Sequence, residues 1–427
     1  MNRSALSRYF QLGFLVCLAL TPFAIDYDYF RPTKSQFVFL NLATLLIVTG
    51  GLLAALARPP QWKIRHRLLM AAPILVLMVI KLLRFFLAGQ GWLSRSPNFF
   101  ALMIWLLVIL FLPRPRWSFY RKSVWLLWAL SVVITLYGLL QYFGIEILHY
   151  AEGRKEKQII ISFLGHPNYI ASFCAPLAFL FLAEFILARG WVARGLMGVA
   201  IVFSGLVVVF GAARAGMLSL IVGAIFFAVL LHRTRAIRIT GRQFALSSLA
   251  LVVVLAGSFV FIRFVRKSPF EISSRLYANY EVASRLYYWK LGMKQFGEHW
   301  LLGSGPGYFR DNYWSLVEQD QEKATPAEVY LLYRMEGVPA GEMHNEFLEL
   351  LVESGLVGFF LAAFFLALVL LRATRKLRCR ALSKSRCVRL VGLLTMFLAF
   401  MVDAQFGFPF QLPASGLLFL LNLWLLI

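Results

Sequence analysis

Residues 195–232 read GLMGVAIVFSGLVVVFGAARAGMLSLIVGAIFFAVLLH. Two apolar runs, 195–211 and 214–232, are separated by a short turn that brings in Arg214. Each run is close to the roughly 20 apolar residues that an α-helix needs to cross the hydrocarbon core of a bilayer. The pattern predicts two neighbouring membrane-spanning helices, with Arg214 at or just inside the membrane surface.

Apolar runs of this kind recur along the whole chain of 427 residues. Hydrophobic residues make up 60% of it and charged residues 15%, with a mean hydropathy of +0.73. A soluble domain is nearer to one-half apolar and one-quarter charged, so the composition predicts an all-α polytopic membrane protein. Windows of about 20 apolar residues predict about 12 transmembrane helices. They lie near residues 10–27, 36–57, 68–89, 98–113, 123–143, 166–188, 195–211, 214–232, 244–264, 350–372, 388–407 and 411–427.

Lysine and arginine are concentrated in alternate connections between the predicted helices. These basic connections lie within residues 58–67, 114–122, 189–194, 233–242 and 372–389. Because Lys and Arg mark the cytoplasmic side of a membrane protein, we expect both termini in the cytoplasm. The same pattern accounts for most of the formal net charge of +23, so the charge requires no nucleic-acid partner.

The predicted helices divide the chain into three parts. Residues 1–264 hold transmembrane helices 1–9, residues 265–349 form one long polar loop, and residues 350–427 hold helices 10–12. The orientation places the loop on the outer side. Loops of this size usually carry function, and we expect a small, partly helical substructure there.

His344 lies in GEMHNEFLELL, where the long loop re-enters an apolar helix. A histidine at a membrane surface is suited to act as a general base because its pKa lies near working pH. The alternative is a helix-start histidine that caps the helix or snorkels. Glu346, Glu349 and Glu353 follow on one helical face, where they either line a polar cavity or face the loop.

Two arginines are candidate ligands for phosphate. Arg214 lies among small residues that leave room for a bulky ligand, and a planar guanidinium can hold phosphate through two hydrogen bonds. Arg285 lies in ASRLYYWK, and Arg275 lies in a similar segment ten residues earlier. Aromatic rings beside arginine suit a sugar diphosphate. The alternatives are a snorkelling arginine at residue 214 and an amphipathic surface helix around residue 285.

The first outer loop carries a further set of charges. Arg31 and Lys34, in YFRPTK, either add positive charge around a pyrophosphate or anchor the chain at the interface. Asp26 and Asp28 could bind a divalent cation, although two carboxylates at the end of a polar loop are a weak signal.

Two glycine-containing turns complete the set of motifs. The segment GSGPGYF at 303–309 lacks the ending of a P-loop and predicts a tight turn that lets the chain or a ligand approach closely. GHPNY at 165–169 predicts a second turn, at the outer start of a span.

Taken in order, these motifs resemble the O-antigen ligase and polymerase family, which also includes some protein O-oligosaccharyltransferases. The order is GHPNY at 165–169, ARAG at 213–216, SRLYYW at 284–289, LLGSGPGYF at 301–309 and HNEFLELLVESGLVG at 344–358. The resemblance implies a GT-C-like architecture in the bacterial inner membrane with a periplasmic active site. It also implies transfer of a glycan from undecaprenyl pyrophosphate to an acceptor hydroxyl, with inversion and without a metal or other cofactor.

The resemblance also implies roles for individual residues. His344 would activate the acceptor hydroxyl, Arg214 and Arg285 would hold the pyrophosphate, and Lys34 is a weaker candidate for the same task. Arg31 is a candidate because it lies beside Lys34. We expect Glu346, Glu349, His166 and Asn168 to line the cavity. The chain departs from the family's usual pattern at Ala213, where serine is frequent, and at His166, where asparagine is common.

Several alternatives remain open. The acceptor can be lipid A-core, as in an O-antigen ligase, a growing polymer, or a protein hydroxyl. A second class of enzyme is a metal-dependent polyprenyl-phosphate glycosyltransferase that uses Asp26 and Asp28. A third reading is a transporter or flippase for lipid-linked glycans, although a flippase needs no large loop on one side.

Overall fold

The structure is a computed structural model in which the described residues are 3–24, 32–57, 65–87, 96–112, 115–147, 160–234, 279–321, 342–378 and 382–427. Within these ranges the chain is helical and contains no β-strand. The predicted span at 244–264 and the residues Arg31, Asp26 and Asp28 lie outside the described residues.

Every predicted span that falls in the described ranges overlaps a helix, although the bounds differ by several residues. These helices are α1 (Arg3–Leu20), α2 (Pro32–Ala57), α3 (Arg65–Leu87), α4 (Ser96–Phe111), α5 (Trp117–Tyr142), α6 (Pro167–Leu187), α7 (Trp191–Phe210), α8 (Arg214–Thr234), α15 (Glu346–Arg378), α16 (Lys384–Asp403) and α17 (Pro413–Leu426). Among the described helices, 7 are long and apolar enough to cross a membrane, and shorter apolar helices accompany them. The protein is therefore a polytopic membrane protein.

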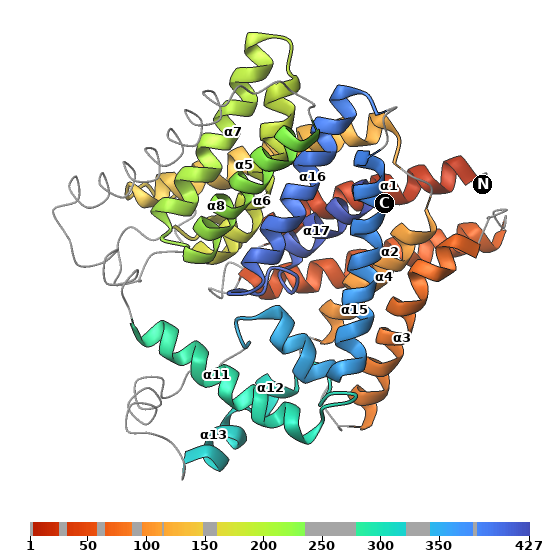
Figure 1. Cartoon of the computed structure of the whole chain (residues 1–427), viewed down its shortest axis with the longest axis vertical. Helices are drawn as coiled ribbons and strands as arrows, with labels where there is room; N and C mark the ends of the chain where they lie inside the picture. Colours follow the sequence, from red (N-terminus) through yellow and green to blue (C-terminus); the bar gives the residue numbers. More distant parts are fainter. Residues whose placement is uncertain are drawn as a thin grey trace.

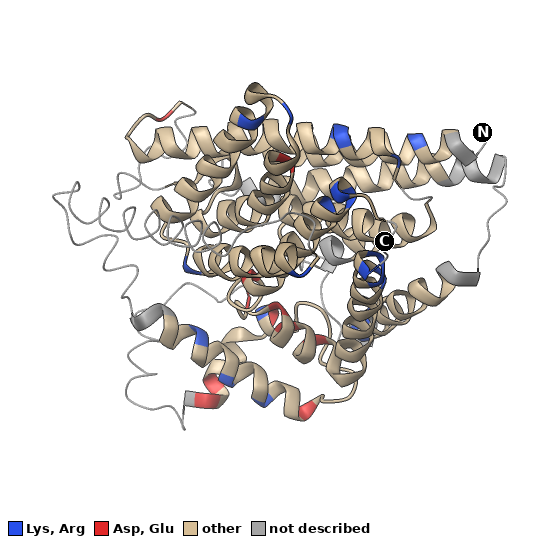
Figure 2. Ribbon diagram, turned by 45° about the horizontal axis from the view of Figure 1, so that its top comes forward, with Lys and Arg blue, Asp and Glu red and all other residues tan. Residues whose placement is uncertain are grey.

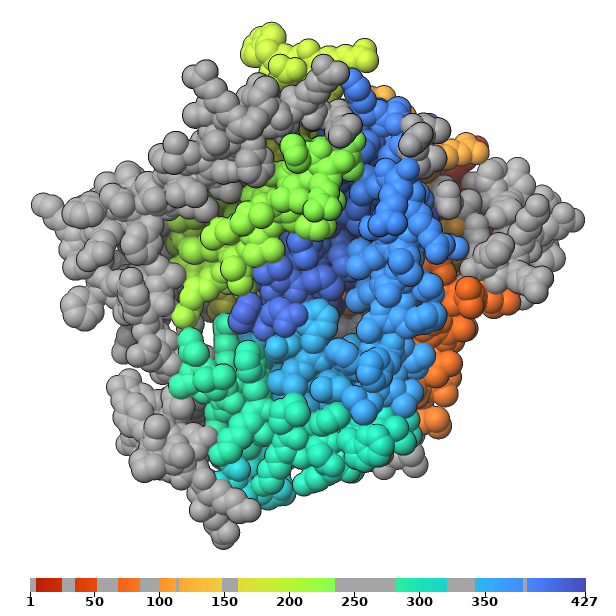
Figure 3. Space-filling view, in the orientation of Figure 1, coloured from red at the N-terminus to blue at the C-terminus, as the bar shows by residue number. Residues whose placement is uncertain are grey.

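The helices form two groups that meet along α15 (Figure 1). In one group α6 packs against α7, α8 and α16, and in the other α15 packs against α3. Three further helices, α11 (Asn279–Glu298), α12 (Tyr308–Asp311) and α13 (Tyr313–Gln321), lie together at one end of the molecule. Figure 3 shows that α11 and α12 form a continuous surface with the first turns of α15.

Of the three apolar clusters among the described residues, two position these groups. The larger joins most of the apolar helices and includes Trp105 and Trp424, whose rings both pack edge-on against Phe14. The smaller joins α11, α12 and α13 to the start of α15 through Tyr288, Tyr313 and neighbouring apolar residues. The polar segment before α15 therefore has a core of its own that continues into a membrane-type helix.

The basic ends of the helices gather on one side. Arg389 at the start of α16 forms an ion pair of 2.7 Å with Glu184 near the end of α6, and its guanidinium lies 4.1 Å from the ring centroid of Trp117 at the start of α5. Lys376 near the end of α15 donates to the backbone carbonyl of Leu426. Asp and Glu are found mostly around α11, α13 and the start of α15, where some Lys and Arg also lie (Figure 2). The opposite helix ends are thus the ones that face the α11–α13 segment.

Helix α15 begins earlier than the predicted span 350–372 and bends at Gly355, where φ is 65°. The glycine turn at 303–307 packs into this bend. Ser304 and Gly305 donate backbone N–H groups to the carbonyls of Val352 and Glu353, both at 3.0 Å. A Cβ at Gly303 would overlap the backbone of Glu353. The predicted tight turn is confirmed, and the close approach is made by the chain itself.

Candidate active site

His344 lies at the turn that leads into α15, with a left-handed backbone conformation at φ 54°. Its ring is nearly parallel to that of Tyr288 on α11, with centroids 6.4 Å apart, and 5.2 Å from that of Phe408. Phe408 belongs to the connection between α16 and α17. Three segments far apart in the sequence therefore meet around this histidine.

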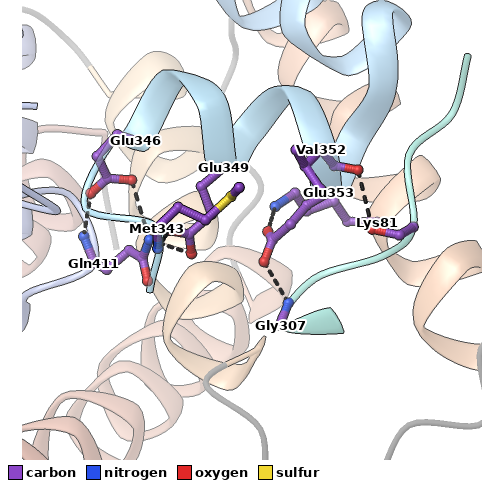
Figure 4. A network of polar contacts seen from close by, with 9 residues as sticks. Lys81, Gly307, Met343, Glu346, Glu349, Val352, Glu353 and Gln411 are labelled. Atoms are coloured by element: carbon purple, nitrogen blue, oxygen red, sulfur yellow. Dashed lines mark hydrogen bonds and ion pairs between the residues drawn. The ribbon is translucent and has the colours of Figure 1, made fainter. Parts of the chain in front are cut away.

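The residue before His344 is fixed through its backbone (Figure 4). The indole N–H of Trp289 donates to the carbonyl of Met343 at 2.9 Å. The N–H of Met343 donates to Glu349 at 3.2 Å, and Gln411 donates to the other oxygen of Glu349 at 2.8 Å. The turn is thus attached to α11, to α15 and to the α16–α17 connection.

A cavity of about 200 Å³ lies beside α15 and is lined in part by Glu349. Its walls are mostly apolar side chains of α3, α4, α15 and α17. Its polar lining consists of Lys81, Arg310, Glu346, Glu349, Glu353 and Gln411. His166 and Asn168 are not among the residues that line it.

The glutamates at this cavity accept hydrogen bonds from different elements. Glu346 accepts from the backbone N–H groups of Phe410 and Gln411, at 2.9 and 3.2 Å. Glu353 accepts from the N–H of Gly307 at 2.6 Å and forms an ion pair of 2.6 Å with Lys81, both drawn in Figure 4. The row of carboxylates thus joins α15 to the glycine turn, to α3 and to the α16–α17 connection.

The turn GHPNY also contacts Phe408. The ring of Tyr169 is 5.6 Å from that of Phe408 and 5.0 Å from that of His166. His166 is exposed, and its Nδ1 accepts the N–H of Asn168, which caps the start of α6. A chain of aromatic rings thus connects His166 to His344.

Arg214 begins α8 and is half-buried. The turn before it has Ala212 in a left-handed conformation at φ 51°, and a Cβ at Gly211 would lie 3.3 Å from the side chain of Pro167. The turn that carries Arg214 therefore packs beside the GHPNY turn, at the same helix ends as His344.

Arg285 lies on α11, one turn before Tyr288, and is also half-buried. Its positive charge acts on the phenol of Tyr288 and on the carboxyl of Asp403 at the end of α16. Lys34 lies in the first turn of α2, and its side chain is outside the described atoms, as is the whole of Arg31. The structure thus brings Arg285 to His344 through Tyr288 and does not place the first-loop cations.

The α11–α13 segment is dominated by buried phenols. Burial raises the pKa of Tyr288 and of Tyr313 above their ordinary value, and it raises that of Asp311 against the opposing effect of Arg310. Desolvation penalises the charged form of each of these acids. At neutral pH both phenols, including that of Tyr288 beside His344, are therefore uncharged.

Sequence reasoning did not single out Trp289, Gln411 or Phe408. Trp289 was noted only as one of several aromatic residues beside Arg285. Gln411 and Phe408 lie in the segment GFPFQL, whose only local signal is a proline-containing break between two spans. Among the described residues, no group of three or more His, Cys, Asp or Glu is arranged to hold a metal ion.

These observations define an all-helical, polytopic membrane protein with a polar site at the helix ends opposite its basic side. Residues 199–363 match the model of the protein family described as O-antigen ligase, so this part of the chain is an O-antigen ligase family domain. The predicted resemblance is confirmed over that range, which includes Arg214, Arg285 and His344. No protein in a search of curated proteins matched the chain.

Proposed function

We propose that this protein is a membrane glycosyltransferase that transfers a glycan from undecaprenyl pyrophosphate to an acceptor hydroxyl on the periplasmic side. We propose lipid A-core as the acceptor, which makes the protein an O-antigen ligase. The observation that carries the proposal is the O-antigen ligase family match at 199–363. The contacts that connect the segments of His344, Arg285 and Arg214 at one set of helix ends support it.

In this proposal His344 takes the proton of the acceptor hydroxyl. The hydroxyl oxygen then attacks the anomeric carbon, and the bond from that carbon to the pyrophosphate oxygen breaks with its electron pair. Arg214 and Arg285 stabilise the departing pyrophosphate, with Lys34 and Arg31 as further cations. Fixed cations aimed at the developing charge are a large source of rate enhancement. Attack from the face opposite the leaving group inverts the anomeric centre.

The topology proposed for this activity has about 12 transmembrane helices in a GT-C-like architecture. Both termini lie in the cytoplasm because the basic helix ends mark that side. The α11–α13 segment and the cavity beside Glu346 and Glu349 then lie at the periplasmic face. Asn168 and His166, at the neighbouring turn, face the same side.

Deletion of the gene in its host tests the function directly. The surface polysaccharide is separated on a gel beside an extract of the lipid-linked pool. Loss of the long ladder from lipopolysaccharide, with long glycan accumulating on the carrier lipid, supports a ligase. Single repeats that remain attached without a ladder indicate a polymerase instead. If neither pattern changes, the acceptor is another molecule, such as a protein hydroxyl, or the protein is a transporter.

A further inference from the structure

Met343 is held on all sides at the point where the chain enters α15. Its side chain is fully buried, and a Cβ at Gly292 of α11 would overlap its methyl group. Its carbonyl accepts from Trp289 and its N–H donates to Glu349. Both backbone polar groups of Met343 and its side chain are thus fixed immediately before the predicted base.

His344 itself has a backbone conformation that needs such support. At φ 54° it lies in the left-handed region, which non-glycine residues adopt seldom and at a cost in free energy. Such conformations persist only where the surrounding structure enforces them. On the other side, the side chain of Asn345 caps α15 by accepting from the N–H groups of Phe347 and Leu348 at 3.1 and 3.0 Å. The left-handed residue is therefore held between two fixed neighbours.

Glu349 is itself oriented from another element. Gln411 donates to one carboxylate oxygen of Glu349 at 2.8 Å and leaves the other for the N–H of Met343. Trp289 lies next to Tyr288, whose ring stacks on that of His344. Helix α11 thus supplies both a donor to the turn and a surface for the imidazole.

We propose that Trp289 and Glu349 are positioning residues that hold His344 in its left-handed conformation and so aim its imidazole. The proposal rests on the role of His344 as the base. Neither residue needs to touch the substrate for this role, because each acts through the backbone of Met343. Displacement of a reacting group by about 1 Å can lower a rate by about 100-fold.

The first test is Trp289→Phe, which removes the indole N–H and keeps an aromatic ring. Trp314→Phe, on the exposed side of α13, is the matched control. Transfer by purified protein in liposomes is measured with a lipid-linked glycan donor and the lipid acceptor as a function of pH. We expect kcat to fall by about 10- to 100-fold with KM nearly unchanged. In the pH–rate profile, the limb that reports the ionisation of His344 should move to a different pH. The control should match the wild type.

The second test is Glu349→Gln, with Glu318→Gln on α13 as its control. A glutamine amide cannot accept from both Gln411 and Met343, so one of the two hydrogen bonds is lost. We expect the same fall in kcat and the same shift of the pH profile, with the folded protein recovered by gel filtration. This variant keeps the test decisive if Trp289→Phe does not fold.

The failure of this inference differs from the failure of the proposed function. An inactive His344→Ala together with unchanged kcat and pH profile in a folded Trp289→Phe or Glu349→Gln protein overturns the positioning role alone. The positioning role is also overturned if the measured rate falls only as much as the amount of folded protein falls and the pH profile is unchanged. Full activity of His344→Ala instead overturns the role of His344 as the base, on which this inference rests, and no transfer by the wild type overturns the proposed function.

Discussion

Lys81 on α3 and Glu353 on α15 form a buried ion pair of 2.6 Å across a separation of 272 residues in the sequence. Glu353 also accepts the N–H of Gly307, so the same carboxylate connects α3, α15 and the glycine turn. Both residues of the ion pair line the cavity. The pair therefore fixes the bend of α15, one turn beyond the residues that hold His344.

Loss of the lysine should destabilise the protein strongly. In Lys81→Met the buried carboxylate of Glu353 keeps the N–H of Gly307 and loses its cation, and removal of one partner from a buried pair costs about 3–5 kcal/mol. The thermal unfolding midpoint in detergent measures the effect. Lys294→Met, on the exposed surface of α11, is the control. Equal midpoints for Lys81→Met and the wild type would contradict the structural role of the pair.

The bend at Gly355 should not tolerate a side chain. Its φ of 65° favours glycine, and a Cβ there would overlap the backbone of Leu301. We expect Gly355→Ala to reduce the yield of folded protein and to lower its unfolding midpoint, because the positive φ alone costs about 1–3 kcal/mol. Gly297→Ala is a matched control since no heavy atom lies within 4 Å of its added Cβ. A normal yield and midpoint for Gly355→Ala would argue against this bend.

Removal of the predicted base should separate folding from activity. In His344→Ala the backbone contacts of Met343 and Asn345 can remain, so we expect a folded and inserted protein. General bases contribute about 10²–10⁴-fold to rates, and transfer to the acceptor should fall by that order. His299→Ala, a histidine that contacts Tyr308, is the control. Wild-type transfer rates in a folded His344→Ala protein would refute the assignment.

Arg214 should require its guanidinium as well as its charge. We expect Arg214→Ala to lower kcat by about 10²–10³-fold, the range found when one fixed donor to a developing charge is removed. Arg214→Lys should recover only part of this, because an ammonium cannot form the bidentate contact. Transfer rates of the purified variants measure both effects, beside Arg194→Ala on the basic side. If lysine restores full activity, the two-hydrogen-bond role is wrong.

Alkaline pH should loosen the α11–α13 segment. Burial raises the folded-state pKa of Tyr288 and of Tyr313 above the ordinary value of 10.0. The stability that follows from keeping both phenols neutral is complete below about pH 10 and is lost as pH rises through the folded-state values. Unfolding midpoints measured on either side of that pH test the effect. Tyr313→Phe should weaken the alkaline loss, and an identical pH dependence in this variant would contradict it.

Site residues could be predicted from the sequence where their signal is a local pattern, and not where it is a contact between residues far apart in the sequence. His344 and Arg214 could be singled out because each stands at the end of an apolar run, a local pattern. The spacing in the sequence places Glu353 on one helical face with Glu346, but it leaves open whether that face lines a polar cavity or faces the loop. The structure shows that Glu353 does both: it lines the cavity and accepts a hydrogen bond from the glycine turn.

The sequence by itself determined the class of fold and the positions of the helices. In a bilayer every backbone polar group must be satisfied within the segment, so a long apolar run has to be a helix whatever it packs against. Charge in the connections likewise predicts orientation without any tertiary contact.

Only the tertiary structure decided which residues surround His344. The ring of Phe408 contacts that of His344, and Trp289 and Glu349 hold the backbone of Met343 before it. Nothing in a local pattern states that α11 lies against the start of α15, or that the α16–α17 connection lies beside the histidine. Side-chain hydrogen bonds and ring contacts act only over a few ångströms. Residues far apart in the sequence come within that distance only when distant helices pack together, and no local sequence pattern records which helices do so.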